Sequence, residues 1–565
     1  FGVTRMQSKD LLSISTRDAL KRWDLVVILS GNKAMTRQCE LYLNWLHEYH
    51  SYPLERILIL PDPPGPKIES FGAIGACINY LHETYGGTFL EWKVLAIMNG
   101  GYNMRMPFCV NKSKLFTVLP VSGDGSMCHL FDVKVKFLSV YIPLMPRGSI
   151  LVTCSDDIET YTFDVGDLGE RVSADLTATG HPSSIQIGTG HGVYVVEKDK
   201  VVESKSIVSL PCLEVLQKPS QDLMKEKGAI ISEHGDGIVI TDSVFWMSSD
   251  LISKISSIYT SLSPLKCEVD IYRDVLPFFG SNQNKHRQCA PELMPTETKC
   301  ILDEYKRVFQ TAFENEPLEV LVERKSNFYH FGTMREYLNL ICRDEGCRDG
   351  LNLSRVCLCT GHFADPSGNT ETDGVVICSA IDAPITSHAL SIVEFCRIST
   401  PIVISNNVIL SHCSIGGSDT VSIPANVTMF TVSMEIDGEE KYCTLAFGCD
   451  DDMKLKIFRH DSQATFLNTD LASVLRTLEL TPEEVFESEV SSMWDLKVFP
   501  IADTMESSFA STLGLVKTAL QLSGDKYSCT NQTRMSLRMC LSLRSYQHMF
   551  NFQKSLMTGF QNNNQ

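Results

Sequence analysis

Five consecutive apolar residues lie at the centre of the segment KRWDLVVILS (residues 21–30). A run that leaves no polar face is typical of a parallel strand buried on both sides of a sheet. Strand and helix patterns then alternate in RILILPDPPGPK (56–67, strand), SFGAIGACINYLHETYGG (70–87, helix), WKVLAIMNGG (92–101, strand) and GSILVTCSDD (148–157, strand). This alternation predicts a doubly wound α/β sheet, whose ligands bind beyond the carboxyl ends of the strands.

The apolar pattern changes near residue 375, where a period of six begins. The period holds in two sets that are one residue out of phase: Val403, Ile409, Ile415, Val421 and Val427, and then Ile392, Ile398 and Ile404. Six residues per face predicts a parallel β-helix, which we expect to be left-handed, with a β-sandwich as the alternative. Helical patterns follow residue 465. We therefore expect an α/β domain over residues 1–355, a β-helix over 356–450 and a mostly helical region over 451–565.

Composition and charge narrow the class of protein. The chain has 565 residues, of which 43% are apolar and 21% charged, as in soluble globular proteins of several domains. Its net charge of −18 argues against a general nucleic-acid or anionic-membrane binder, because such surfaces need a basic excess. The 20 cysteines lack the regular spacing of a disulfide scaffold. We expect a cytoplasmic protein without nucleic-acid or membrane partners, and we leave an oligomer open.

Glycines and cations follow two of the expected strands. They are Gly65 and Lys67 in DPPGPK, and Gly100, Gly101, Arg105 and Lys114 in NGGYNMRMPFCVNKSK (99–114). Glycine lets backbone N–H groups approach phosphate oxygens, and the cations would neutralise charge on a departing pyrophosphate. These segments predict a phosphate-binding site, with an ordinary polar surface turn as the alternative.

Carboxylates and a further lysine extend this constellation. Asp156 and Asp157 follow the apolar strand in ILVTCSDD, where one or two carboxylates would hold Mg²⁺ on a phosphate, and an N-cap or solvated turn is the alternative. Lys218 in VLQKPS suits a sugar phosphate, although a lysine before a proline is by itself more typical of an ordinary surface turn. Together the residues favour nucleotidyl transfer to a sugar 1-phosphate, which needs no covalent enzyme intermediate.

A longer series of motifs resembles the fucose-1-phosphate guanylyltransferase family, also called GDP-L-fucose pyrophosphorylases. The series is DPPGPKI, NGGYNMRMP, KLFTVLP, ILVTCSDDIE, GHPSSIQIGTGHGVYVV, QKPS, ITDSVFWM, CEVDIYRD, NFYHFGTMREYL and MWDLKVFP, between about residues 22 and 505. The resemblance implies a nucleotidyltransferase domain followed by a β-helix. It also implies transfer of GMP from GTP to L-fucose 1-phosphate, with Mg²⁺ as the cofactor.

The same resemblance implies roles for single residues. These are Arg105 and Lys114 as the signature cations, Asp156 or Asp157 as the metal ligand, Gly192 beside the base or sugar, Lys218 on the sugar phosphate, Glu268 as an acceptor for a sugar hydroxyl, and Asp270 for a further metal or sugar contact. Gly65, Lys67, Gly72, Gly100 and Gly101 are expected to line the nucleotide site.

One loop departs from the family pattern. After GPKI the family continues with Gly-Asn-Gly-Gly-Ser-Thr, whereas this chain has ESFGAI (69–74) and keeps only Gly72. Glu69 would repel phosphates if it pointed inward, and Phe71 could fill space that a nucleotide needs. The alternative function is therefore a homologue that binds a sugar phosphate or a partner without catalysis. A hexapeptide acyltransferase is a third hypothesis, which the large α/β domain disfavours.

Overall fold

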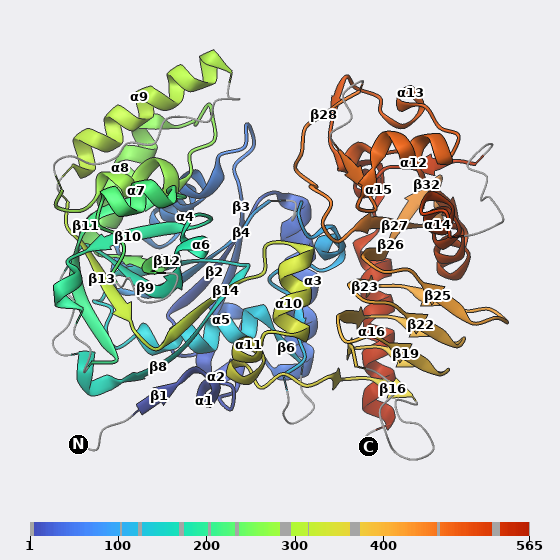
Figure 1. The fold of residues 1–565 in the computed structure, drawn as a ribbon. Helices are drawn as coiled ribbons and strands as arrows, with labels where there is room; N and C mark the ends of the chain where they lie inside the picture. The colour runs from blue at the N-terminus through green and yellow to red at the C-terminus, as the bar shows by residue number, and fades with distance from the viewer. Residues whose placement is uncertain are drawn as a thin grey trace. The chain divides into compact units, whose positions relative to one another are not determined.

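The computed structural model describes residues 5–101, 104–121, 127–168, 174–201, 205–231, 237–282, 295–314, 316–361, 373–459, 464–522 and 532–563. The chain forms two compact units, and each includes segments that are distant in sequence (Figure 1). Unit 1 comprises Phe1–Gly101 and Leu130–Tyr329, and unit 2 comprises Tyr102–His129 and His330–Gln565. The division into three domains stays a prediction.

A nine-stranded sheet organises unit 1, in the order β10-β11-β13-β9-β12-β7-β4-β2-β3. Its parallel part is made of β2 (Leu25–Ser30), β3 (Ile57–Pro61), β4 (Lys93–Asn99) and β7 (Ser149–Cys154). Every residue of β2 is buried, which confirms the strand expected from its apolar run. The rest of the sheet is mixed, with β9 (Leu176–Ser184), β10 (Gly192–Val196), β11 (Ile207–Gln217), β12 (Ile238–Met247) and β13 (Leu318–Glu323).

Helices alternate with the parallel strands, as the sequence predicts for an α/β protein. They include α3 (Lys33–His50), α4 (Glu69–Tyr85), α5 (Leu130–Leu138), α8 (Ser249–Leu262) and α9 (Thr296–Phe313). One large core joins α4, α8 and α9 to alternate residues of β2, such as Val27. Side chains of the intervening residues of β2 face α3, since the Ser30 hydroxyl lies 2.6 Å from that of Thr36.

The order of the parallel strands defines a switch point in unit 1. The chain passes from β2 to β3 on one side of β2 and then returns to β4 on its other side. Crevices for ligands form where the order reverses in this way, beyond the carboxyl ends of the strands. The residues that follow β2 and β4 are therefore the first place to look for a site.

Short parallel strands form three stacks in unit 2. The stacks have the orders β15-β17-β20-β23-β26, β16-β18-β21-β24 and β19-β22-β25. The first stack consists of β15 (Val356–Cys357), β17 (Val375–Ile377), β20 (Ser391–Glu394), β23 (Val408–Ser411) and β26 (Val427–Ile436). The second consists of β16 (Thr360–Gly361), β18 (Ala380–Ile381), β21 (Arg397–Ile398) and β24 (Ser414–Ile415), and the third of β19 (Ile385–Ser387), β22 (Ile402–Ile404) and β25 (Val421–Ile423). Figure 1 shows the strands of unit 2 lying above one another.

The length of one turn of these stacks corrects the expected apolar phase. Val376 pairs with Val393 and Val393 with Leu410, so one turn takes 17 residues rather than the 18 that three faces of six would need. A strict period of six therefore slips by one residue after such a turn, and a later turn takes 19 residues, because Ile402 pairs with Val421 and Ile409 with Thr428. The slip explains why Ile404 is buried whereas Val403 is 37% exposed.

Antiparallel strands and helices complete unit 2. β26 pairs with β27 (Glu439–Gly448), and the later elements include α12 (Leu471–Thr477), α14 (Met505–Ala519), α15 (Leu537–Leu543) and α16 (Tyr546–Asn563). These helices confirm the helical patterns expected beyond residue 465.

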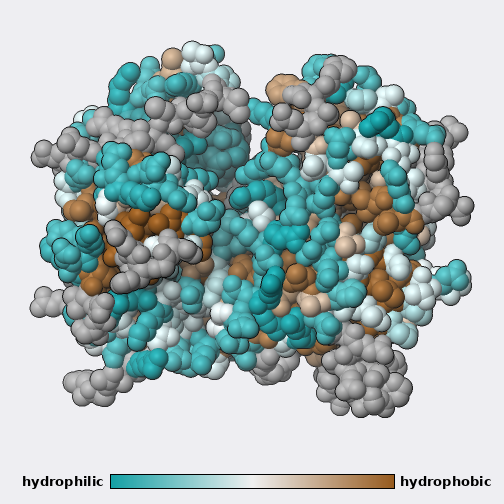
Figure 2. Space-filling view, in the orientation of Figure 1, coloured by the Kyte–Doolittle hydropathy of each residue, from teal (hydrophilic) through white to brown (hydrophobic). Residues whose placement is uncertain are grey.

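Exposed large apolar side chains are few and scattered in the described chain. They are Tyr80, Ile187, Val403, Phe458, Val490, Leu522 and Leu543. Polar residues cover most of the face in Figure 2. Among the helices that the structure describes, none is long and apolar enough to cross a membrane.

Candidate active site

Two glycine turns meet at the switch point. A Cβ atom added to Gly31 would lie 3.1 Å from the backbone nitrogen of Gly101 and 3.4 Å from the Cα of Gly100. Gly101 has a φ of +88°, which favours glycine. Gly31 follows β2 directly, and Asn32 then caps α3 by accepting a hydrogen bond from the Met35 N–H. Sequence reasoning missed Gly31, although it follows the first buried strand just as Gly100 follows β4.

Asp156 and Asp157 lie at the end of β7, as expected, but their surroundings differ. Asp157 begins β8 (Asp157–Asp164) and is buried, and its carboxylate forms an ion pair with Lys134 of α5. Lys134 Nζ also donates to the Thr153 hydroxyl at 2.9 Å. Burial raises the pKa of Asp157 to about 7, and Lys134 opposes that rise. Asp156 is only partly buried.

These residues fit a divalent cation better than other described groups do. Within the described ranges, Cys154, Asp156 and Asp157 form the one group of three potential ligands, with their ligand atoms within 4.8 Å of one another. Mg²⁺ prefers carboxylate oxygens to a thiol, so the two aspartates suit it. Because the Asp157 carboxylate is paired with Lys134, Asp156 is the better candidate for the direct ligand.

A third carboxylate, Asp242 of β12, approaches Gly192. The Gly192 N–H donates to Asp242 Oδ1 at 3.0 Å, and a Cβ added to Gly192 would lie 2.0 Å from Oδ2. A side chain at residue 192 would therefore require the Asp242 carboxylate to move. Lys218 and Asp270 are close enough to influence the pKa of Asp242. Sequence reasoning did not single out Asp242, although it belongs to the motif ITDSVFWM.

Lys218 lies on an exposed turn after β11. Its φ of 48° is in the left-handed region, and its N–H donates to the His191 carbonyl at 2.9 Å. A lysine in this conformation is strained, and such strain persists where the surroundings fix the backbone. Gly192 and Lys218 therefore lie near one another, because this hydrogen bond joins Lys218 to the residue directly before Gly192.

Asp242 is expected to make the stability of unit 1 sensitive to pH. Burial raises its pKa to about 7 from the ordinary 3.8, so the folded state holds a proton that the unfolded state releases between these values. The stabilising contribution is present below about pH 4 and is lost as the pH rises through 7. Asparagine does not titrate, so its chain escapes this loss. We expect the free energy of unfolding of Asp242→Asn, relative to that of the natural chain, to rise by a few kcal/mol between pH 5 and pH 8.

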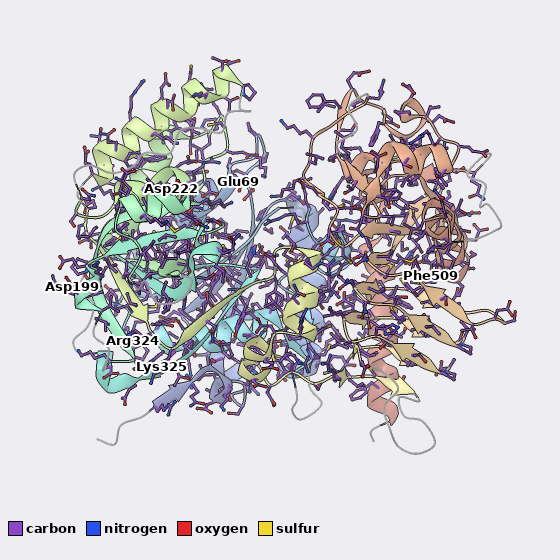
Figure 3. All side chains as sticks on the ribbon, in the orientation of Figure 1. Glu69, Asp199, Asp222, Arg324, Lys325 and Phe509 are labelled. Carbon is purple, nitrogen blue, oxygen red and sulfur yellow. The ribbon has the colours of Figure 1, made fainter. Side chains whose placement is uncertain are left out.

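Urea unfolding of both chains at the two pH values measures this difference. Asp222→Asn is the matched control, since Asp222 is exposed on α7 (Gln221–Glu226; Figure 3). If the difference in the free energy of unfolding between Asp242→Asn and the natural chain is the same at both pH values, the raised pKa of Asp242 is contradicted.

Lys67 is held between two carboxylates rather than standing alone. Its Nζ lies 2.5 Å from Glu69 Oε1 and 3.3 Å from Glu268 Oε1, and all three side chains are partly exposed. Glu69 begins α4 with a φ of 55° and is labelled in Figure 3. Burial and then Glu69 raise the pKa of Asp62 to about 6. Glu69 therefore faces other charged groups and is itself paired with the predicted nucleotide lysine.

Asp270 has a local structural role. Its carboxylate accepts hydrogen bonds from the Tyr272 N–H at 2.8 Å and the Arg273 N–H at 3.1 Å, and so caps the short helix η7 (Ile271–Val275). Burial raises its pKa. These contacts fix the orientation of the Asp270 side chain, while its role toward a sugar or metal stays a prediction.

The segment ESFGAI is helical here. Phe71 is buried and packs against Phe309 of α9, with 4.8 Å between ring centroids. The side chain belongs to the core, so the expectation that it could fill space needed by a nucleotide is wrong. Gly72 lies inside α4, where a Cβ would clash with Ile68 at 2.5 Å, and it serves helix packing rather than an open loop. Gly65 lies in the preceding loop with a φ of +137° and open space around its Cα.

Glu69→Gly is expected to increase affinity for a magnesium nucleoside triphosphate by about 5-fold, on the order of 1 kcal/mol. The change removes a negative charge and releases Lys67. Glu69→Gln is the control, because it removes the charge and keeps a side chain in the left-handed region. Calorimetric titration with the magnesium nucleoside triphosphate should give similar affinities for both variants. If both variants bind it with the affinity of the natural chain, Glu69 has no role in nucleotide binding.

Arg105 and Lys114 belong to unit 2, although Gly100 and Gly101 belong to unit 1. Arg105 is exposed and Lys114 is buried. Ser113 has a φ of 66°, in the left-handed region that favours glycine. Sequence order alone does not reveal that this segment packs with a different unit from the strand before it.

The fold of unit 1 and the residues at its switch point are those of α/β proteins that bind their ligands beyond the carboxyl ends of parallel strands. The model of the fucose pyrophosphorylase domain matches residues 88–504. The chain therefore belongs to the fucose pyrophosphorylase family, which consists of nucleotidyltransferase enzymes.

Two curated relatives support this assignment over nearly the full length. A fucose-1-phosphate guanylyltransferase of Mus musculus is 28% identical, over 96% of this chain and 94% of the relative. A fucose-1-phosphate guanylyltransferase of Homo sapiens is 25% identical, over 94% of this chain and 90% of the relative.

Proposed function

We propose that this protein transfers GMP from GTP to L-fucose 1-phosphate and forms GDP-L-fucose and pyrophosphate. A phosphate oxygen of the sugar phosphate attacks the α-phosphorus of GTP, and the bond from that phosphorus to the α,β-bridging oxygen breaks. The electron pair leaves with pyrophosphate. The names of the two relatives support the substrates. The observation that carries the proposal is the approach of Gly31 to Gly100 and Gly101, at the end of β4, which pairs with the strand that Asp156 and Asp157 follow.

Each group has a task in this reaction. The backbone of Gly31, Gly100 and Gly101 approaches the triphosphate, and Arg105 and Lys114 neutralise charge on pyrophosphate. Lys218 binds the phosphate of the sugar, while Lys67 contributes to nucleotide binding once Glu69 is displaced. Glu268 and Asp270 accept hydrogen bonds from sugar hydroxyls.

Asp156 would hold Mg²⁺, with Asp157 beside it. The bound cation supplies charge stabilisation at the phosphates and orients them for displacement. Lys134 keeps the Asp157 side chain in place through its ion pair. The donor set of carboxylates supports magnesium over a softer metal.

The finer description of the fold is also part of this proposal. Unit 1 would be a doubly wound sheet of the nucleotidyltransferase type, and the parallel stacks of unit 2 a left-handed parallel β-helix. The divisions at residues 355 and 450, a cytoplasmic location and the absence of nucleic-acid or membrane partners belong to the same proposal.

Product analysis tests the reaction directly. The purified chain is incubated with GTP, Mg²⁺ and β-L-fucose 1-phosphate, and nucleotide sugars are separated and weighed by mass spectrometry. We expect GDP-fucose, and at least ten times less product from α-D-mannose 1-phosphate. Binding of fucose 1-phosphate without any product, from a folded sample, would favour the non-catalytic homologue.

A further inference from the structure

The segment of residues 104–121 forms hydrogen bonds along its whole length with the rest of unit 2. It contains Arg105 and Lys114, and it comes between β4 and α5 in the sequence. The contacts are from Trp494 Nε1 to the Met104 carbonyl (3.2 Å), from Arg544 to the Val110 carbonyl (3.2 Å), from Asn111 to the Thr431 carbonyl (2.7 Å), from Lys112 to Glu394 (2.5 Å) and from the Ser354 N–H to the Pro120 carbonyl (2.7 Å).

Trp494 binds the residue directly before Arg105. Its side chain is only 2% exposed, and its indole N–H is directed at the Met104 carbonyl. Trp494 lies in the short helix η9 (Met493–Asp495), where the Ser492 N–H donates to Asp495 Oδ2 at 2.9 Å. Because its own helix is capped in this way, Trp494 offers a fixed donor to the backbone at Arg105.

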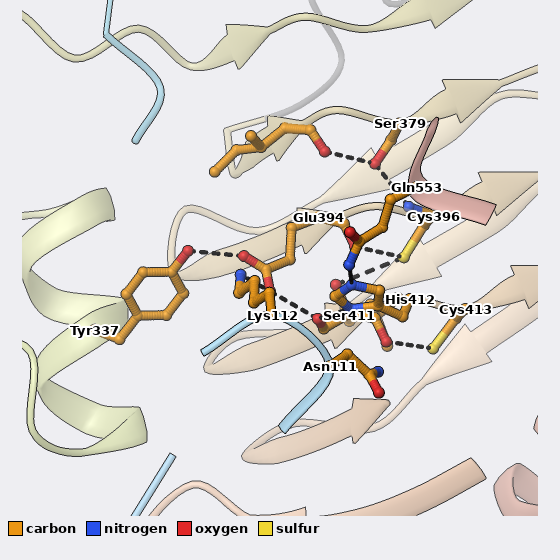
Figure 4. Close-up of polar contacts among 12 residues, drawn as sticks. Asn111, Lys112, Tyr337, Ser379, Glu394, Cys396, Ser411, His412, Cys413 and Gln553 are labelled. Atoms are coloured by element: carbon orange, nitrogen blue, oxygen red, sulfur yellow. Dashed lines mark hydrogen bonds and ion pairs between the residues drawn. The ribbon is translucent and has the colours of Figure 1, made fainter. Parts of the chain in front are cut away.

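Glu394 of β20 holds the segment near Lys114. One carboxylate oxygen of Glu394 accepts from Lys112 at 2.5 Å and from Ser411 at 2.7 Å, and the other accepts from Tyr337 at 2.9 Å. Figure 4 shows these side chains converging on Glu394. The Lys112 and Glu394 side chains are 0% and 1% exposed. A buried pair with its hydrogen bonds satisfied fixes geometry, since any displacement leaves a charge unpaired.

We propose that Trp494 and Glu394 are positioning residues, with Trp494 fixing the backbone that presents Arg105 and Glu394, through Lys112, fixing the backbone that presents Lys114. This inference rests on the proposed function, in which both cations bind pyrophosphate. Within unit 2, β20 and β26 supply the contacts that hold the segment carrying these two cations.

A double-mutant cycle tests the role of Trp494. We expect Trp494→Phe to weaken binding of magnesium pyrophosphate about 10-fold, and to have no further effect in the Arg105→Ala background, because Trp494 acts through Arg105. Calorimetric titration of pyrophosphate gives the affinities without requiring turnover. Trp246→Phe is the matched control, since the indole N–H of Trp246 has no hydrogen-bond partner among the described residues. Losses that multiply in the double variant, or a loss equal to that of Trp246→Phe, would overturn the role of Trp494.

A second cycle addresses Glu394. We expect Lys112→Met/Glu394→Gln, which leaves no unpaired charge, to keep its melting temperature close to the natural value while pyrophosphate affinity falls about 10-fold. The fall should disappear in the Lys114→Ala background. Natural pyrophosphate affinity in the folded variant would overturn the role of Glu394. If Arg105→Ala and Lys114→Ala each leave pyrophosphate affinity unchanged, the proposed cation roles fail first, and the positioning roles with them.

Discussion

Asp156→Asn is expected to reduce magnesium-dependent pyrophosphate release about 1,000-fold and to leave the melting temperature unchanged. Asparagine keeps the size of the side chain but loses the charge that would bind the cation. Asp156 lies on the partly exposed turn after β7, so we expect its replacement to cost less stability than a replacement in the core. Initial rates at saturating Mg²⁺, together with thermal unfolding, measure both quantities.

Asp157→Asn is the informative comparison, because the same chemical change falls on a buried ion pair. It leaves the Lys134 ammonium without its partner, which we expect to destabilise unit 1 by about 3–5 kcal/mol. If Asp157→Asn abolishes turnover at a temperature where the variant is folded, while Asp156→Asn retains more than a tenth of the rate, the assignment of the direct ligand is reversed.

Arg105→Ala is expected to lower kcat by about 100- to 1,000-fold with a smaller change in the KM for fucose 1-phosphate. The arginine would neutralise charge that develops on pyrophosphate as the bond to the α-phosphorus breaks, so its loss affects the transition state more than the bound sugar. Arg105 is exposed, and the variant should keep the stability of the natural chain. Steady-state kinetics with varied fucose 1-phosphate separates kcat from KM.

Arg147→Ala serves as the control for Arg105. Arg147 is 82% exposed and lies 4.0 Å from the exposed Glu91, a surface pair that contributes little. Its replacement should leave both kinetic constants unchanged. An unchanged kcat in Arg105→Ala would show that the cation facing pyrophosphate lies elsewhere.

Local patterns predicted the elements well because they depend on burial alone. The first five residues of Leu25–Ser30 are all apolar. A strand that is covered on both faces of the sheet buries every one of these side chains. The apolar period after residue 375 likewise predicted short parallel strands. Its phase was wrong at Val403, since a turn of 17 residues is not a multiple of six.

Contacts between distant residues were beyond the sequence. The residues near Asp157 in the chain do not indicate that Lys134 forms an ion pair with it. The residues near Phe71 likewise do not indicate that its ring packs against Phe309. The Asp242 carboxylate beside Gly192 depends on the pairing of β10 with β12. By contrast, Gly31 was predictable in principle, because a glycine after a buried parallel strand is the same signal that identified Gly100.

The altered loop also shows why a departure from a family pattern needs a structure. Glu69 and Phe71 both suggested a damaged nucleotide site. The structure separates them, since Phe71 belongs to the core, whereas Glu69 forms an ion pair with Lys67. Changing both to glycine would leave a cavity in the core and lower the free energy of unfolding by about 3–5 kcal/mol. Changing Glu69 alone tests the effect of its charge on nucleotide binding without disturbing the core.

Pyrophosphate release is the measurement that tests the proposed activity most directly. The purified chain is given Mg²⁺, β-L-fucose 1-phosphate and each nucleoside triphosphate in parallel, with Arg105→Ala as the inactive reference. The account predicts release with GTP that depends on fucose 1-phosphate and is lost in the reference variant. No release with any triphosphate, from protein whose cooperative thermal unfolding shows that it is folded, would contradict it.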